Sequence, residues 1–396
     1  MNATALRAGV VIAGLLIAWR IVQVNVVLYD ENGQARLPAT ASTGVNAPTL
    51  DRELLHRVLD RNPGHVVALL NLAREHERAG DAQKARQAYD AAYALAPLHR
   101  DVLGAVADYY LRLGSNAEAI ALLDRLVDAY PDARALAFPV LGKLLLAHAQ
   151  PAAWSAIAAR KAAWIGPFIE LSCRQGMDPA ALVPLLLSRV ADRRAAADEI
   201  GCIVDHLRDA DRWAEAYQVW LNTLLRERLG DVGFVYNGSF EFASSGVGFD
   251  WRLSRARERD SGHVVETPQA AGVTGQRALR VSFNGKRQAG IPVMQYMALE
   301  PGRYEMSGLA RPQSITAGRG VQWTLRCVKH GQVQPALANS ERFVGSSEWR
   351  RFSFEVAVPN DCHGQLLQLE PLGLADGTVY LAGTAWFDDL VLRRLR

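Results

Sequence analysis

The four cysteines are the side chains of this chain with the most direct chemistry. Cys173 and Cys202 fall in a stretch with helical periodicity, whereas Cys327 and Cys362 fall in a stretch that alternates like β-strands. Two cysteines in each part permit one disulfide within each part, as expected in an oxidising compartment. Free buried thiols are the alternative. The spacings match no zinc-binding pattern, so the sequence predicts no metal site at the cysteines.

Motifs that carry catalytic chemistry are absent from the sequence. There is no glycine-rich phosphate loop, no His-Glu-x-x-His and no Gly-x-Ser-x-Gly, and the nine histidines are scattered singly. A glycosidase needs two facing carboxylates. Asp250, Glu370 and Asp388 stay open as candidates, but no pattern selects them. We therefore expect this chain not to be an enzyme.

Alternation places polar side chains on one face of several expected strands. In residues 321–328 the apolar side chains point to one side and the polar ones to the other. The polar set predicted in this way, with its continuation on other strands, is Gln322, Thr324, Arg326, Arg311, Gln368 and Glu370. Planar polar side chains of this kind can hydrogen-bond to hydroxyl groups. The alternative is the ordinary solvated face of an antiparallel sheet.

Composition indicates a globular, multidomain protein. The chain has 396 residues, a hydrophobic fraction of 49% and a charged fraction of 21%, which allows two or three domains with full cores. A net charge of +3 does not favour nucleic acid as a partner. The basic residues are almost all Arg and Ala is abundant, which indicates a GC-rich bacterial genome.

The first thirty residues contain an apolar segment. Residues 8–29 are apolar apart from Arg20, Gln23 and Asn25, and about 20 such residues can span a bilayer. A cleaved secretory signal peptide is the alternative, although no clear cleavage site follows. Arg7 precedes the segment and Asp30 follows it, so the positive-inside rule predicts a single-pass anchor in the bacterial inner membrane. The N-terminus would be cytoplasmic and the bulk of the chain periplasmic.

A repeat of 34 residues follows a linker at residues 31–50. Pro63, Pro97 and Pro131 keep this period, and glycine and alanine positions recur in the same register. The pattern is that of tetratricopeptide repeats (TPR), which are helix–turn–helix units stacked into a solenoid. We expect such an array over residues 51–230, with a concave surface for a protein partner. Its predicted groove residues are Asn71, Arg74, Tyr109, Tyr110 and Arg112, and packing of both tyrosines between helices is the alternative.

After residue 230 the period changes to two. Eight short strands are expected at 234–240, 278–283, 293–297, 302–311, 321–328, 350–358, 365–371 and 386–393. That number of strands predicts two packed antiparallel sheets. The expected fold is therefore multidomain α + β: a transmembrane helix at 1–30, the linker, a helical solenoid, and a β-sandwich at 231–396.

Five motifs in residues 233–396 carry a resemblance to a family. They are Asn237-Gly238-Ser239-Phe240-Glu241, Gly248-Phe249-Asp250-Trp251, Pro301-Gly302-Arg303-Tyr304, Trp349-Arg350-Arg351-Phe352-Ser353-Phe354 and Phe387-Asp388-Asp389-Leu390-Val391-Leu392. In this order they resemble carbohydrate-binding jelly rolls, the galactose-binding-like sandwiches related to modules of bacterial cellulases and xylanases. Each motif alone is weak, and their order makes the resemblance specific.

The resemblance implies two sites. Related modules hold a structural calcium ion near their first and last strands, and the matching donors here would be Glu241, Asp388 and Asp389. Related modules also bind sugars on an aromatic ring beside planar polar side chains. Trp251 would supply the ring and Arg252 a guanidinium, with core packing as the alternative for Trp251.

The combination of parts suggests an accessory protein of cell-surface polysaccharide assembly or export, such as exopolysaccharide or O-antigen. The array would bind a polymerase, ligase or export component, and the sandwich would hold the glycan. This expectation rests on domain combination and not on site chemistry. The alternative is a scaffold whose sandwich binds protein and no glycan.

Overall fold

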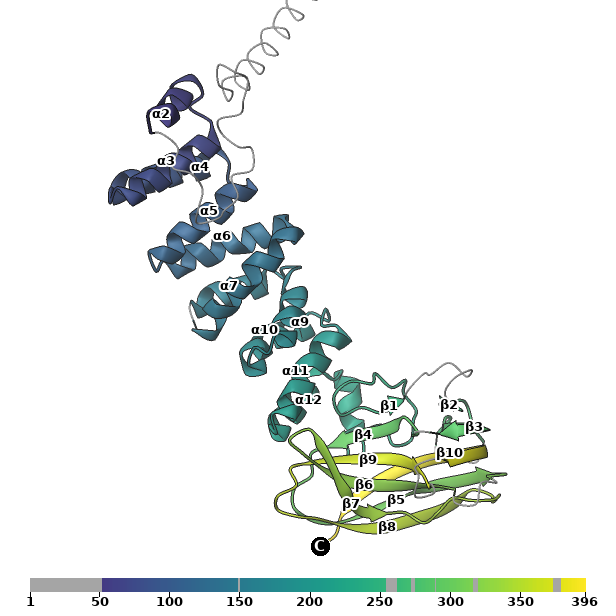
Figure 1. The fold of residues 1–396 in the computed structure, drawn as a ribbon. Helices are drawn as coiled ribbons and strands as arrows, with labels where there is room; N and C mark the ends of the chain where they lie inside the picture. Colours follow the sequence, from purple (N-terminus) through teal and green to yellow (C-terminus); the bar gives the residue numbers. More distant parts are fainter. Residues whose placement is uncertain are drawn as a thin grey trace, which may run out of the picture. The chain divides into compact units, whose positions relative to one another are not determined.

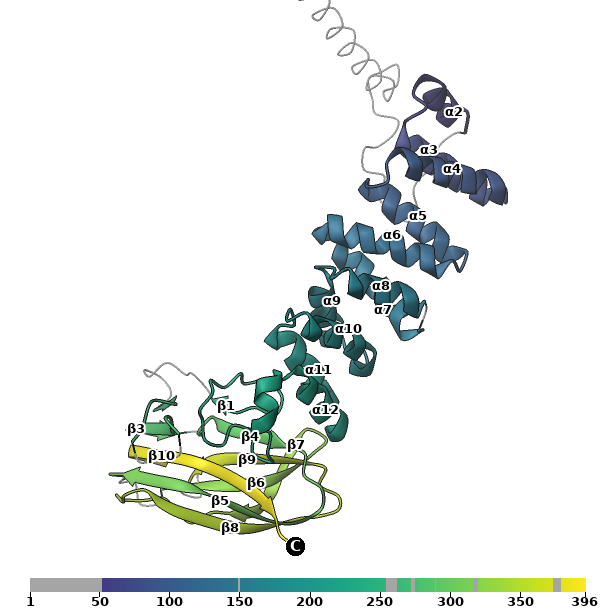
Figure 2. The same cartoon turned by 180° about the vertical axis from the view of Figure 1, so that it is seen from behind.

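The computed structural model of the protein describes residues 52–148, 150–253, 262–271, 275–288, 290–315, 320–372 and 379–396. The chain divides into two compact units, one ending at Trp164 and one running from Ile165 to Arg396. Figures 1 and 2 show the helices and strands of these units from two sides. Within the described ranges no helix has the length and apolar character needed to cross a bilayer. The predicted anchor at 8–29 and the linker at 31–50 lie outside these ranges.

The first unit is a series of helical hairpins preceded by a single helix. The elements are α2 (Arg52–Arg61), α3 (Val66–Arg78), α4 (Ala82–Leu95), α5 (Arg100–Arg112), α6 (Asn116–Ala129), η1 (Pro131–Ala133), α7 (Arg134–Leu146) and α8 (Pro151–Ala159). Helices α3, α5 and α7 start at residues 66, 100 and 134, which keeps the predicted 34-residue period.

The recurring small residues have the positions that the period predicted. Gly80 and Gly114 make the hairpin turns with φ of 78° and 72°, a backbone region that glycine adopts without a steric penalty. Ala73, Ala85 and Ala107 have no exposed surface, so the helices approach closely at these points. The helix–turn–helix repeat is confirmed.

Polar contacts link each hairpin to the next one. Arg112 of α5 pairs with Glu77 of α3 through two hydrogen bonds of 2.8 Å. Arg160, after α8, donates a 3.1 Å hydrogen bond to Asp128 of α6. These pairs span 35 and 32 residues, close to one repeat, so each repeat satisfies the charges of its neighbour.

The second unit begins with four more helices and a short 3₁₀ helix: α9 (Ile165–Arg174), α10 (Pro179–Ala191), α11 (Ala197–Asp209), α12 (Trp213–Thr223) and η2 (Arg226–Asp231). A buried ion pair ties α10 to α11, because Arg189 donates two hydrogen bonds of 2.6 and 2.7 Å to Glu199. Only 2% of the Glu199 side chain is exposed. Cys173 of α9 forms a disulfide with Cys202 of α11.

Two antiparallel five-stranded sheets follow. Their strands are β1 (Arg252–Leu253), β2 (His263–Glu266), β3 (Leu279–Gln288), β4 (Val293–Met297), β5 (Gly302–Gln313), β6 (Val321–Lys329), β7 (Gln332–Asn339), β8 (Arg350–Val358), β9 (Gly364–Pro371) and β10 (Val379–Arg394). The first sheet has the order β1-β4-β9-β6-β7 and the second the order β2-β3-β10-β5-β8. The predicted β-sandwich is confirmed, and β1, β2 and β7 are strands that the sequence pattern did not indicate.

Aromatic side chains fill the space between the two sheets. Neighbouring ring centroids lie 5.0–5.8 Å apart along a continuous series of buried rings. The series runs Phe240, Trp251, Trp323, Phe387, Phe343 and Phe352. Beside it, Cys327 of β6 is bonded to Cys362, so all four cysteines are paired as the sequence allowed.

The expected strand at 234–240 is wrong, because this segment is a turn. Asn237 and Phe240 have positive φ, and the Asn237 amide exchanges hydrogen bonds of 2.9 and 3.2 Å with the backbone of Phe242. Gly238 lies against β10, where a Cβ would come 2.0 Å from the carbonyl oxygen of Leu390. The first and last motifs of the sandwich therefore meet, although the first is not a strand.

Candidate functional site

The outer face of the first sheet gathers most of the polar side chains that alternation singled out. In β6, Trp323 and Leu325 point into the core, and Thr324 lies between them on the opposite face. The register pairs Gln322 with Glu370 and Thr324 with Gln368 across β6 and β9. We call Gln322, Thr324, Arg326, Gln368 and Glu370 the polar face.

The polar face is held in place by hydrogen bonds among its own members. Arg326 donates to both Glu370 carboxylate oxygens, from Nε to Oε1 and from Nη2 to Oε2, each at 3.0 Å. The Thr324 hydroxyl donates to Glu370 Oε2 at 3.0 Å, and Arg326 also reaches the Gln334 carbonyl at 3.3 Å. The Arg326 and Glu370 side chains are 25% and 20% exposed, so solvent reaches the pair. Such a surface offers oriented donors and acceptors with balanced charge.

Helices α11 and α12 cover the other end of the same sheet face. The indole of Trp213 lies on the backbone of Gly364, at the start of β9. Arg252 of β1 donates two hydrogen bonds of 2.7 and 3.0 Å to the Asp205 carboxylate of α11. The Arg208 guanidinium of α11 lies 3.6 Å from the centroid of the Tyr296 ring of β4. Part of the sheet face is therefore already occupied by polypeptide.

Tyr296 is the aromatic ring nearest to the polar face along the register, since it pairs with Leu366 next to Arg326. The guanidinium of Arg208 covers this ring, in a cation–π contact. Burial lowers the pKa of the Arg208 guanidinium from its usual value. One face of the Tyr296 ring therefore already contacts a side chain of the same protein.

Trp251 lies in the core, which corrects its predicted role as a sugar-stacking ring. It has no exposed surface and packs between Phe240 and Trp323. Its indole N–H donates a 3.1 Å hydrogen bond to the Asn237 carbonyl. A tryptophan after a turn has the same local pattern in a core or on a surface, so only the packing separates the two.

Two predicted arginines do not join the polar face. Arg311 is on β5 of the second sheet, opposite Trp386 of β10. Arg252 is on the first sheet but is bound to Asp205. The set that the structure brings together is therefore Gln322, Arg326, Gln368 and Glu370, with Thr324 between them.

The three carboxylates predicted to hold calcium do not form a ligand group in the described part of the chain. Glu241 Oε1 accepts the backbone N–H groups of Gln276 and Arg277, both at 2.9 Å. Asp389 lies 3.9 Å from the Arg351 guanidinium, and Asp388 is fully buried. Two of these carboxylates thus already have partners within the chain: Glu241 accepts two backbone N–H groups, and Asp389 lies near a guanidinium. Calcium stays a prediction.

In the helical repeats, the predicted groove residues are partly buried, and one of them is ion-paired within the chain. Tyr109 is 3% exposed and stacks on Tyr89 with ring centroids 4.4 Å apart, so it is a packing residue. Burial and the nearby Glu77 carboxylate raise the pKa of Tyr89 to about 12. Arg112 is exposed and pairs with Glu77. The remaining predicted positions, Asn71, Arg74 and Tyr110, are half-buried.

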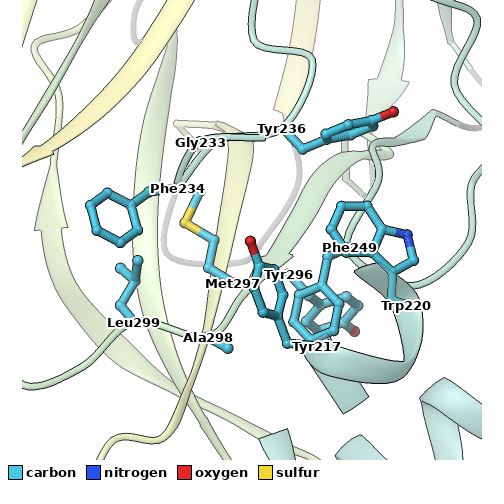
Figure 3. Close-up of a pocket in the computed structure, with 10 residues that line it drawn as sticks. All are labelled: Tyr217, Trp220, Gly233, Phe234, Tyr236, Phe249, Tyr296, Met297, Ala298 and Leu299. Carbon is cyan, nitrogen blue, oxygen red and sulfur yellow. The ribbon is translucent and has the colours of Figure 1, made fainter. Parts of the chain in front are cut away.

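A small aromatic pocket lies where α12 meets the sandwich (Figure 3). It has a volume of about 70 Å³ and no charged side chain in its lining. Figure 3 shows Phe234 and Leu299 on one side of it and Trp220 with Phe249 on the other. The rings of Tyr217 and Phe249 meet edge to face at 5.0 Å. The pocket is part of the seam that joins the helices to the first sheet.

Sequence reasoning missed Tyr296 on the outer face of the first sheet, and it missed Asp205 and Arg208 of α11, which contact side chains of that face. Their partners lie between 47 and about 90 residues away in the chain, so no local period could indicate them. The three candidate carboxylates for catalysis are separated as well. Asp250 and Asp388 are buried, and Glu370 is bound to Arg326 on the outer face.

Comparison with known families bears on the helical part. The family described as tetratricopeptide repeat matches residues 52–100 and 70–134. We call residues 52–134, which this family matches, the TPR region. The hairpins α3–α4 and α5–α6 fall inside this match, in agreement with the 34-residue period of the sequence. No curated protein matches the sequence.

Solved structures similar to the chain align over part of its length. One is described by "CBM4 structure and function", with 15% identity, a TM-score of 0.30, and coverage of 41% of this chain and 99% of that one. A second is a family 61 module in complex with β-1,4-galactotriose, with 16% identity, a TM-score of 0.28, and 41% and 99% coverage. A third is a xylan-binding domain of family 22, with 18% identity, a TM-score of 0.28, and 41% and 96% coverage. Ligand assignment for this chain depends on its own side chains.

Proposed function

We propose that this chain is a non-catalytic scaffold that binds a glycan through the polar face and a protein partner through its TPR region. The observation that carries the glycan part is the convergence of Gln322, Arg326, Gln368 and Glu370 on one half-buried patch of the outer face of the first sheet. Amide and carboxylate oxygens accept hydrogen bonds from sugar hydroxyls, and guanidinium and amide N–H groups donate to them. The balanced Arg326–Glu370 pair favours a neutral glycan over a charged one.

Two further parts of the proposal concern location and pathway. The two disulfides suit an oxidising compartment, which supports a periplasmic position for the bulk of the chain behind an inner-membrane anchor at 8–29. In that position the chain would act in assembly or export of a surface polysaccharide, with a polymerase, ligase or export component as partner. Deletion of the gene tests this, and unchanged amount and chain length of the surface glycan would refute the pathway.

Calorimetric titration of the full chain tests the glycan part. Suitable probes are xylohexaose, β-1,4-galactotriose and surface polysaccharides of the host cell. We expect saturable binding that Gln368→Ala weakens about tenfold, which corresponds to about 1.4 kcal/mol for the loss of a shared hydrogen-bonding amide. The matched control is Arg303→Ala, which removes an exposed Arg–Glu pair (2.6 Å) from the second sheet and should leave binding unchanged.

A second candidate function is protein binding by the sandwich. It is favoured by the seating of α11 and α12 on the same sheet face, since this face already packs against helices. A folded chain that gives no heat with any of the glycans would reject the first candidate and leave this one. Binding to a glycan that is equally weakened by Arg303→Ala would also reject the polar face as the site.

A further inference from the structure

Helices α9 and α11 bring together two cysteines and a histidine. Cys173 lies on α9, and Cys202 and His206 lie one turn apart on α11. His206 Nδ1 is 3.4 Å from Cys173 Sγ and 3.7 Å from Cys202 Sγ. In the described part of the chain, this is the one group of three His, Cys, Asp or Glu side chains whose ligand atoms are close enough to share an ion.

In the oxidised state this group cannot hold a metal ion through its sulfurs, because they are bonded to each other. His206 Nδ1 lies 2.9 Å from the carbonyl oxygen of Cys202. A carbonyl oxygen only accepts, so Nδ1 carries the proton and donates it there. The lone pair of the neutral ring is then on Nε2.

The spacing of the three atoms is that of a tetrahedral metal site. Zinc binds cysteine sulfur at about 2.3 Å and histidine nitrogen at about 2.0–2.1 Å, which places nitrogen and sulfur ligands about 3.6 Å apart. The two nitrogen–sulfur distances, 3.4 and 3.7 Å, already bracket this value. The two sulfurs must separate to about 3.8 Å for tetrahedral zinc, and His206 Nδ1 must give up its hydrogen bond to the Cys202 carbonyl. Their Cα atoms are 6.2 Å apart, so rotation of the cysteine side chains can supply the separation.

We propose that reduction of the Cys173–Cys202 disulfide converts this group into a three-ligand site for a thiophilic divalent ion, Zn²⁺ in the first place. A dithiol gives two electrons and two protons to the disulfide and becomes a disulfide itself. The metal ion then displaces both thiol protons, and the His206 proton moves from Nδ1 to Nε2 so that Nδ1 can bind. Two thiolates and one imidazole leave the fourth position open to water.

Exposure and comparison within the chain support the assignment. Cys173 is fully buried, whereas Cys202 and His206 are half-buried, so an ion and a reductant reach the group from the α11 side. The other disulfide, Cys327–Cys362, has no such ligand group around it within the described residues. The Cys327–Cys362 disulfide therefore serves as an internal control for metal binding after reduction.

Cobalt binding to the full chain, reduced by a phosphine without oxygen, tests the proposal. A phosphine takes up the oxygen of one water molecule as it reduces the disulfide, and it leaves no competing thiol. We expect one Co²⁺ per chain, with the visible bands of tetrahedral cobalt and a thiolate charge-transfer band. Cys173→Ser with Cys202→Ser should abolish these bands, and His206→Ala should weaken binding at least tenfold. Cys327→Ser with Cys362→Ser should retain them.

Thermal unfolding separates a folded site from cysteines of an unfolded chain. Zn²⁺ should raise the unfolding midpoint of the reduced chain, because it binds the folded state preferentially, and should leave the oxidised chain unchanged. Three results would overturn the proposal: no bands from the reduced chain, bands that survive Cys173→Ser with Cys202→Ser, or no zinc-dependent rise in the midpoint.

Discussion

Gly364→Ala tests the packing of α12 on the sandwich, because it adds one methyl group where the Trp213 indole lies on β9. A Cβ at this residue would lie 1.9 Å from the indole of Trp213, against 3.4–4 Å for an ordinary contact. The ring would have to retreat by about 1.5 Å or more to restore that separation. Trp213 is 2% exposed, and its N–H donates a 2.9 Å hydrogen bond to Asp211, so it has little freedom to move.

The expected cost of Gly364→Ala follows from these contacts. Forcing a side chain into a packed core costs about 1–3 kcal/mol, and loss of the Trp213 hydrogen bond adds about 0.5–1.5 kcal/mol. We expect the free energy of unfolding of the second unit to fall by about 1.5–4.5 kcal/mol. Trp213→Phe in the same chain should recover part of this loss, because the smaller ring leaves room for the methyl group.

Urea unfolding followed by near-ultraviolet circular dichroism measures the effect, with hydrogen exchange in α12 to locate it. The matched control is Gly201→Ala in α11, where the nearest atom to a new Cβ is a Val247 methyl at 3.8 Å. Alanine is favoured over glycine in a helix by about 0.5–1 kcal/mol, so the control should stabilise the chain. If Gly364→Ala does not lower the free energy of unfolding relative to Gly201→Ala, then Trp213 does not pack on β9 and the reasoning is refuted.

Two further perturbations probe buried charges in the second unit. Glu199→Ala leaves the Arg189 guanidinium buried without its carboxylate partner, so it should lower the free energy of unfolding by about 3–5 kcal/mol. Replacing both residues, with Arg189→Met and Glu199→Leu, should lower it by less, because no buried charge is left unpaired. Equal losses for the two variants in urea unfolding would contradict this. Burial raises the pKa of Asp250 above its usual value, so folding disfavours its ionised form. Its contribution to stability is present below the unfolded pKa and is lost as pH rises through the folded pKa, so the stability of the natural chain relative to Asp250→Asn should increase as pH falls from 7 towards 4. A pH-independent difference between these two chains would show that Asp250 has no such role.

The parts of the fold that sequence predicted are those with a local period. The helical hairpins follow from glycine and alanine recurring in register, and β6 follows from strict alternation around Trp323. The turn at Asn237 was missed because its left-handed backbone leaves no trace in a two-residue pattern. It is specified by an amide that bonds to residue 242 and by a glycine that fits against β10.

The site was predicted only where it lies within neighbouring strands. Gln322, Arg326, Gln368 and Glu370 share a face because β6 and β9 pair, and alternation alone indicates that they point outward. The contact of Arg208 with Tyr296 depends on packing between a helix and a sheet far apart in sequence, as does the approach of His206 to Cys173. Such contacts are set by three-dimensional packing and have no sequence signal of their own.

Helices α11 and α12 pack on the first sheet, so the segment that recombination can transfer intact with the sandwich begins at residue 165 and not at residue 231. A gene exchange at residue 230 would deliver a sandwich with an uncovered Tyr296, an unpaired Arg252 and an apolar seam open to solvent. An exchange at residue 164 keeps these partners together. The last four helices are therefore expected to be inherited together with the sandwich.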